Sequence, residues 1–142
     1  MLAETIARLQ AEAPILRLVE GAAELAALKA LPPRMPAAYV IPLAEAAQPN
    51  TRAGVHHQRI EAAIGVVLFV KGERADPKGG AQVVALEDVR DQVGAALLGW
   101  PPFEGASGLD FVAGDLLGFG DQVVRWQDTY ETHFARRARR QP

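Results

Sequence analysis

Three histidines, His56, His57 and His133, are the side chains of this sequence best suited to metal binding or acid–base chemistry. His56 and His57 are adjacent, so on a strand they point to opposite faces and cannot ligate one metal ion without a bulge. A site would need one of them together with His133 and a carboxylate such as Asp128 or Asp110. No metal-site spacing relates these positions, so we expect neither a metal ion nor a cofactor.

Nucleophilic catalysis has little support, because the chain has one serine and no cysteine. Ser107 follows Gly105-Ala106, and the nucleophile elbow Gly-x-Ser-x-Gly would need glycine where Leu109 stands. Without cysteine, disulfides, thiolate zinc sites and cysteine nucleophiles are excluded. The adjacent carboxylates Glu87 and Asp88 fall in the early turns of a predicted helix, where they favour its dipole. We therefore expect no catalytic residue and no enzymatic activity.

Basic residues flank the longest predicted strand and are candidates for contact with a partner. They are Arg52, His56, Arg59, Lys71 and Arg74. One interpretation is a rim that contacts an acidic partner. The alternative is a solvated sheet edge, where charged side chains prevent stray strand pairing.

The charge of the chain is unevenly distributed. Four of its 15 basic residues are arginines in the last seven positions, and the remaining 11 against 17 acidic residues give the body a net charge of −6. The basic tail, residues 136–142, suits either a solvated terminus or contact with nucleic acid, but an acidic body argues against a general DNA-binding module. No signal peptide or apolar stretch of about 20 residues is present, so we expect a soluble cytosolic protein and no membrane contact.

The elements that would position these residues follow from hydrophobic periodicity and from proline and glycine. Helices are predicted at 2–12, 22–30 and 83–98, and strands at 15–19, 37–41, 55–71, 109–118 and 122–135. Polar loops are predicted at 44–54 and 72–82. The strand 37–41 lies between Pro36 and Pro42, which fix its ends because proline cannot donate to a ladder.

Two of these segments need a closer argument. In 55–71, Ile64 and Leu68 belong to a wholly apolar face, and the opposite face is apolar only in its middle, so this strand is central or partly covered by another subunit. Near the C-terminus, Trp126, Tyr130 and Phe134 are four residues apart, which suits a helix, but β-branched and aromatic residues around them favour a strand.

Together these elements predict one α+β domain over residues 1–135, followed by the basic tail. Its sheet is expected to be mainly antiparallel with about four strands, and the helices are expected to pack on one face.

The order of these segments resembles the small tail terminator, or tail-completion, proteins of long-tailed bacteriophages and prophages. The resemblance extends from about residue 36 to residue 137. It is carried by Pro36-Ala37-Ala38-Tyr39-Val40-Ile41-Pro42, Phe69-Val70, Leu98-Gly99-Trp100-Pro101-Pro102, Leu109-Asp110-Phe111-Val112-Ala113-Gly114-Asp115 and Trp126-Gln127-Asp128-Thr129-Tyr130.

The resemblance implies an α+β protomer that forms a ring, usually a hexamer. The ring caps the finished tail tube, ends its polymerisation and presents a surface for the head. The implied partners are copies of the chain, the tail-tube protein and a head-completion protein, with DNA only passing through the ring. The implied locations are the host cytoplasm during assembly and then the virion tail. The family has no catalytic residues to carry over, and the arginine-rich tail departs from its pattern.

Two other hypotheses remain open at this point. A small α+β enzyme or ligand-binding domain would bring His56, His133 and Asp128 together in a concave pocket. A nucleic-acid module would use the arginine tail, with binding that weakens steeply as salt rises.

Overall fold

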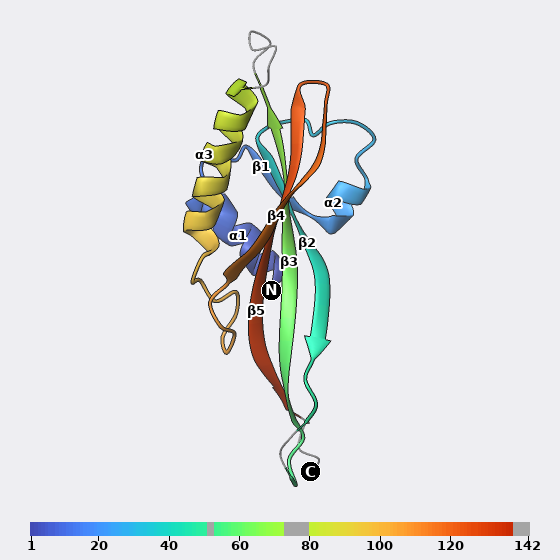
Figure 1. The fold of residues 1–142 in the computed structure, drawn as a ribbon, viewed down its shortest axis with the longest axis vertical. Coiled ribbons are helices and arrows are strands. Elements are labelled where there is room, and N and C mark those ends of the chain that lie inside the picture. Colours follow the sequence, from blue (N-terminus) through green and yellow to red (C-terminus); the bar gives the residue numbers. More distant parts are fainter. Residues whose placement is uncertain (51–52, 73–79, 138–142) are drawn as a thin grey trace.

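A mixed sheet of five strands organises the chain, in the order β1-β2-β3-β5-β4 (Figure 1). The structure, a computed structural model, describes residues 1–50, 53–72 and 80–137, and it describes residues 80–85 by their backbone alone. The strands are β1 Leu18–Gly21, β2 Ala37–Ala47, β3 His57–Lys71, β4 Asp110–Gly120 and β5 Val123–Arg137, and the helices are α1 Leu2–Glu12, α2 Ala22–Ala26 and α3 Gly80–Leu97.

The α+β class is confirmed, but the sheet differs from the expected antiparallel sheet of about four strands. It has five strands, and β1 pairs with β2 in parallel while every other pair is antiparallel. Parallel neighbours need a crossover connection, which here is α2 with the segment that leads to Pro36. The apolar composition of residues 15–19 indicates a strand, but it does not indicate whether that strand pairs with its neighbour in parallel or antiparallel.

Helices cover both faces of the sheet, which corrects the expectation that they pack on one. On the face that we call the α3 face, Ile64, Val66 and Leu68 of β3 pack with α1 and α3. On the opposite α2 face, Val67 and Phe69 pack with the segment that contains α2. The apolar middle of the second face of β3 is therefore covered by the chain itself.

The second helix is shorter than predicted, because α2 ends at Ala26 where the sequence suggested residue 30. The apolar residues that follow do not continue a helix but pack against the α2 face as part of the crossover. These are Leu28, Leu31 and Met35. The prolines at 32 and 33 end any helical tendency in this segment.

Strand β2 continues beyond Pro42 to Ala47, so the prediction that it ends at residue 41 and that a loop begins at 44 is wrong. The register shifts between Pro42 and Ala44, which is a β-bulge. β1 pairs only with Ala37–Val40 of β2, so the proline lies on a free edge where its missing N–H is tolerated.

The ambiguous C-terminal segment is a strand, as predicted. Trp126, Tyr130 and Phe134 of β5 stand opposite Leu68, Ile64 and Ile60 of β3. β4 and β5 are joined by a tight turn at Asp121 and Gln122, whose φ angles are 52° and 61°. Positive φ at both central residues matches the right-handed twist of the hairpin.

Beyond the helices, β2, β3 and β5 continue as a narrow extension that we call the distal arm (Figure 1). Its outermost pair is His57 opposite Arg137. The first two residues of the predicted tail, Arg136 and Arg137, therefore belong to β5. Among the described helices, none is long and apolar enough to cross a membrane.

Candidate functional site

The three residues proposed for an enzyme site are not brought together. Asp128 stands opposite Val66, and His133 stands opposite Glu61. Five residues apart on β5, they point to opposite faces and are separated by about 16 Å along the strand. His56 precedes β3 and contacts Gln58 at 3.1 Å. Within the described part of the chain, no group of histidines and acids could hold a metal ion.

Ser107 has a structural contact that its sequence context did not predict. Its hydroxyl lies 3.1 Å from the Thr132 hydroxyl and accepts a hydrogen bond from the His133 backbone N–H at 2.9 Å. Phe103 of the same loop packs edge to face against Phe134 of β5, with ring centroids 5.1 Å apart. These contacts fasten the loop between α3 and β4 to the distal arm.

The candidate partner-contact residues are spread over the molecule. Arg59 and His56 lie at the distal arm, where Arg59 is 3.8 Å from Glu61. Lys71 ends the same strand twelve positions from Arg59, which is about 40 Å in extended chain. Arg52 and Arg74 lie outside the described residues. The three described residues therefore do not form one continuous rim.

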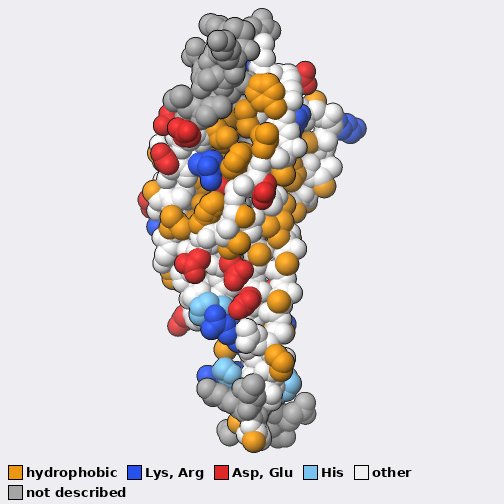
Figure 2. All heavy atoms as spheres, viewed as in Figure 1, with side chains coloured by type: hydrophobic (Ala, Val, Ile, Leu, Met, Phe, Trp, Pro, Cys, Tyr) orange, Lys and Arg blue, Asp and Glu red, His pale blue; other side chains and the backbone are white. Residues whose placement is uncertain are grey.

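Strand β4 carries a surface that the sequence analysis did not single out. Eight large apolar side chains are exposed in the described part of the chain, and five of them belong to this one strand. They are Phe111, Val112, Leu116, Leu117 and Phe119, which together we call the β4 surface. Figure 2 shows hydrophobic side chains gathered in the upper half of the molecule. Exposed apolar groups of this kind mark interaction sites.

β4 is also an edge strand, with no strand on its outer side among the described residues. Two register shifts interrupt its pairing with β5, and the extra residues are Val112 and Leu117. Natural edge strands are commonly protected by lysine, proline or bulges. β4 contains bulges but no lysine, arginine or proline, so it keeps an apolar edge open to a partner.

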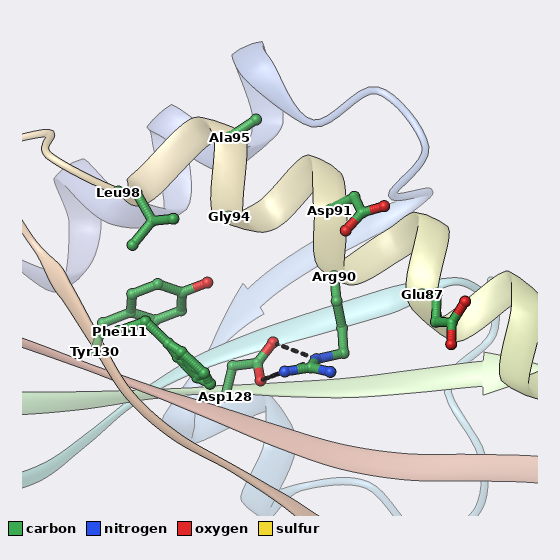
Figure 3. A pocket seen from close by; sticks show the side chains of 9 residues that line it. All are labelled: Glu87, Arg90, Asp91, Gly94, Ala95, Leu98, Phe111, Asp128 and Tyr130. Atoms are coloured by element: carbon green, nitrogen blue, oxygen red, sulfur yellow. Dashed lines mark hydrogen bonds and ion pairs between the residues drawn. The ribbon is translucent and has the colours of Figure 1, made fainter.

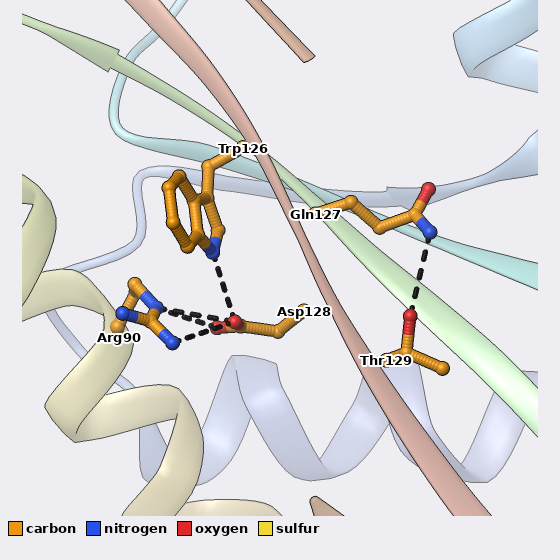
Figure 4. A network of polar contacts seen from close by, with 5 residues as sticks. All are labelled: Arg90, Trp126, Gln127, Asp128 and Thr129. Atoms are coloured by element: carbon orange, nitrogen blue, oxygen red, sulfur yellow. Dashed lines mark hydrogen bonds and ion pairs between the residues drawn. The ribbon is translucent and has the colours of Figure 1, made fainter. Parts of the chain in front are cut away.

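An ion pair beneath β4 fastens helix α3 to the sheet (Figure 4). Arg90 donates from Nε to both carboxylate oxygens of Asp128 at 3.1 Å, and its Nη2 lies 3.0 Å from Oδ1. Trp126 donates from Nε1 to the same Oδ1 at 2.9 Å. The guanidinium stacks 4.7 Å from the centroid of the Trp126 ring. Asp128 is only 2% exposed, so these donors are what allow its charge to be buried.

Gly114 lets β4 lie directly over this ion pair. A Cβ at this position would be 2.9 Å from Trp126 Cζ2, 3.0 Å from Arg90 Nη2 and 3.0 Å from Asp128 Oδ1. Any side chain here would push the edge strand away from α3. The glycine, the ion pair and the indole therefore set the position of the apolar edge.

A pocket of about 300 Å³ opens between α3 and β4 (Figure 3). Glu87 and Asp91 from α3 line it on one side, and Phe111 and Tyr130, whose ring centroids are 5.8 Å apart, lie together on the sheet side (Figure 3). Burial, and then the Asp128 charge, raise the pKa of the Tyr130 hydroxyl far above its usual range. The only cation of the pocket, Arg90, is already paired with Asp128, so the described side chains leave its mouth acidic.

The opposite edge of the sheet is formed by β1 and by the end of β2. A hollow of about 350 Å³ lies along β1 and is lined by Leu16, Arg17, Glu20 and Arg34, among others. Gln10 donates a hydrogen bond to the Val19 carbonyl at 3.3 Å, which occupies part of this edge. Arg17 and Arg34 are exposed and have no ion pair with any described residue.

Comparison with known proteins gives a family match and a set of solved structures that resemble this fold. A family model described as "Phage tail terminator protein" matches residues 2–141. A chain of the structure titled "Virion of native gene transfer agent (GTA) particle" is similar in fold, with a TM-score of 0.63 and 14% sequence identity over 96% of this chain and 95% of that chain. No curated protein matches the sequence.

Proposed function

Since the chain belongs to the phage tail terminator family, which the match over residues 2–141 shows, we propose that it caps the finished tail tube and ends its polymerisation. Its role is that of a structural tail protein, as the family implies. Capping would also offer a surface for a head-completion protein. Assembly would take place in the host cytoplasm, with the tail of the virion as the final location.

The observation that carries this proposal within the structure is the β4 surface. An edge strand that exposes five large apolar side chains is unfavourable on a protein that works alone, but it suits one that is covered during assembly. We propose that copies of the chain form a ring, of six subunits in the usual form of the family, with DNA only passing through it. Tail-terminator rings need two kinds of surface, one for neighbouring subunits and one for the tube.

We propose the distal arm as the second kind of surface. It extends away from the helices (Figure 1), and its described tip carries His57, Arg59 and Arg137 on one face of the sheet. Such a basic tip suits an acidic surface on the tail tube or on the head-completion protein. Of the described candidates for this contact, Arg59 lies on this face and His56 directly precedes β3 at the same tip.

Electron microscopy of tube polymerisation tests the proposed function. Tail-tube protein from the same phage or prophage is allowed to polymerise with and without this protein. Capping predicts shorter tubes that carry additional density at one end. Tubes of unchanged length with bare ends would contradict the proposal. The tube must be present in the assay, because a protein that assembles only on the tube end is monomeric without it.

A further inference from the structure

We propose that the β4 edge of one subunit docks head to tail against the β1–β2 edge of a second copy. The inference rests on the proposed function, since it names the contact that would close the ring. A closed ring needs two different patches that match each other, one on each side of the subunit. The two free edges of the same sheet are such a pair, because the strand order places β1 and β4 on opposite sides.

The strand directions allow the sheet to continue from one subunit to the next. β4 runs antiparallel to β5, β5 to β3, and β3 to β2, while β1 is parallel to β2. β4 therefore runs opposite to β1. When two copies are related by rotation about an axis close to the strand direction, β4 of one lies antiparallel to β1 and β2 of the next. Antiparallel edges pair readily, and this mode of recognition gives main-chain hydrogen bonds.

The charges around the β4 edge are negative. Asp110 and Asp115 lie on the strand itself, and Glu87 and Asp91 lie on the adjoining helix α3. None of these four acids has an ion pair within the described part of the chain. Arg90 does not offset them, because it is held by buried Asp128.

The hollow along β1, on the opposite edge, has the complementary charge and shape. Arg17 and Arg34 line the hollow along β1, and Glu20 is the one acid that lines it with them. Protruding apolar side chains on β4 would face this hollow and the exposed Leu43 at the bulge of β2. In this contact the acidic, protruding β4 edge meets a hollow with two arginines that have no ion pair to any described residue.

The same charges argue against the other way of pairing this edge. A two-fold contact between two β4 edges would place Asp110 and Asp115 of each copy near those of its partner. Like charges facing each other across an interface oppose association. The head-to-tail contact avoids this repulsion, because each β4 edge then faces the β1–β2 edge of the next copy.

Two variants, each blocked at one edge, test the inference. Leu117→Lys with Phe119→Lys places cations on the β4 edge and leaves the β1 edge intact. Arg17→Glu with Arg34→Glu does the reverse. All four side chains are exposed, so both variants are expected to fold, which circular dichroism checks. Val55→Lys is the matched control, because Val55 is also exposed but lies outside both edges.

The readout is the amide chemical-shift spectrum of one isotope-labelled variant titrated with the other, unlabelled, up to the solubility limit. We call Arg17→Glu with Arg34→Glu the arginine variant and Leu117→Lys with Phe119→Lys the lysine variant. In the mixtures, we expect the amide signals of β4 to shift in the labelled arginine variant, and those of β1 and the end of β2 to shift in the labelled lysine variant. Dilution of either variant alone should shift no signal. No shift in either mixture, or self-association of the arginine variant through β4, overturns the inference. The Val55→Lys control must behave as the unmodified protein does.

The two proposals fail separately. If the unmodified protein caps tubes in electron microscopy while the blocked variants ignore each other, the edge contact is wrong and the capping function stands. If the variants pair through the two edges while tubes stay uncapped, the contact stands and the function is wrong.

Discussion

At Gly114, a single hydrogen side chain decides how closely the edge strand approaches α3. We expect Gly114→Ala to lower the free energy of unfolding by about 1–3 kcal/mol, because the added methyl meets a stacked indole and a buried ion pair that cannot both move away. Urea unfolding followed by tryptophan fluorescence measures the change.

Gly120 provides the matched control on the same strand. A Cβ there meets nothing within 4 Å, so Gly120→Ala should be neutral or stabilise by up to about 1 kcal/mol through reduced freedom of the unfolded chain. Equal losses at both positions would contradict the role given to Gly114.

Tyr130 gives the fold a dependence on alkaline pH. Burial, with the nearby Asp128 charge, raises the pKa of its hydroxyl in the folded protein, while in the unfolded chain the pKa is about 10. Between these two pKa values the folded state keeps a proton that the unfolded state has lost. The free energy of unfolding should therefore fall as pH rises above about 10, by up to about 1.4 kcal/mol per pH unit.

Tyr130→Phe removes the titrating hydroxyl and should flatten this decline, although Tyr39, whose pKa is also raised by burial, continues to contribute. Unfolding midpoints between pH 7 and pH 11 for both proteins measure the effect. Parallel declines in the two proteins would show that Tyr130 is not responsible.

At the scale of elements, both backbone and side-chain contacts hold the loop between α3 and β4 to β5, and the Ser107 hydroxyl makes two of them. Ser107→Ala removes the acceptor for the His133 N–H and the partner of the Thr132 hydroxyl. We expect a loss of about 1–2 kcal/mol, together with faster amide hydrogen exchange in residues 100–109.

Thr129 is the control for this loop, because its hydroxyl on the same strand makes only a 3.4 Å contact with Gln127. Thr129→Ala should leave exchange in the loop unchanged. If Ser107→Ala also leaves it unchanged, the loop is held by the contacts that this variant keeps. These are the backbone hydrogen bonds of Ser107 with His133 and Thr132 and the ring contact of Phe103 with Phe134.

The sequence predicted an element well where its hydrophobic period or its composition is compatible with only one type of secondary structure. Helix α3 has its apolar stripe at Val89, Val93 and Leu97, and all three are fully buried. Gly99, two residues after the end of this helix, has a φ of 76°, which glycine adopts without strain. The predictions failed where tertiary pairing decides the outcome, as at Pro42, where a bulge on a free edge lets β2 continue.

The candidate site was harder to predict for a related reason. Leu116 and Leu117 fall inside the predicted strand 109–118 and Phe119 just after it, and only the strand order shows that β4 lies at the edge. The ion pair of Arg90 and Asp128 joins residues 38 positions apart, and no local pattern relates them. Sequence order did support the family, which the match over residues 2–141 shows.

At the scale of the whole molecule, the two ends of β3 should differ in their contribution to tube binding. His56 and Arg59 lie at the distal arm, and Lys71 lies at the other end of the strand. The pair of Arg59 with Glu61 is long and exposed, so it contributes little to stability. Replacing these side chains should change recognition without unfolding the protein.

We expect His56→Glu with Arg59→Glu to weaken binding to tube ends at least about tenfold, equivalent to roughly 1.4 kcal/mol, because two candidate contacts with an acidic surface become repulsive. Lys71→Glu should bind as the unmodified protein does. Electron microscopy counts capped ends across a protein titration, at low and at physiological salt, where screening should weaken the unmodified contact as well. A double variant that caps as well as the unmodified protein would remove the distal arm as the tube contact, whereas loss in Lys71→Glu alone would move that contact to the opposite end of the sheet.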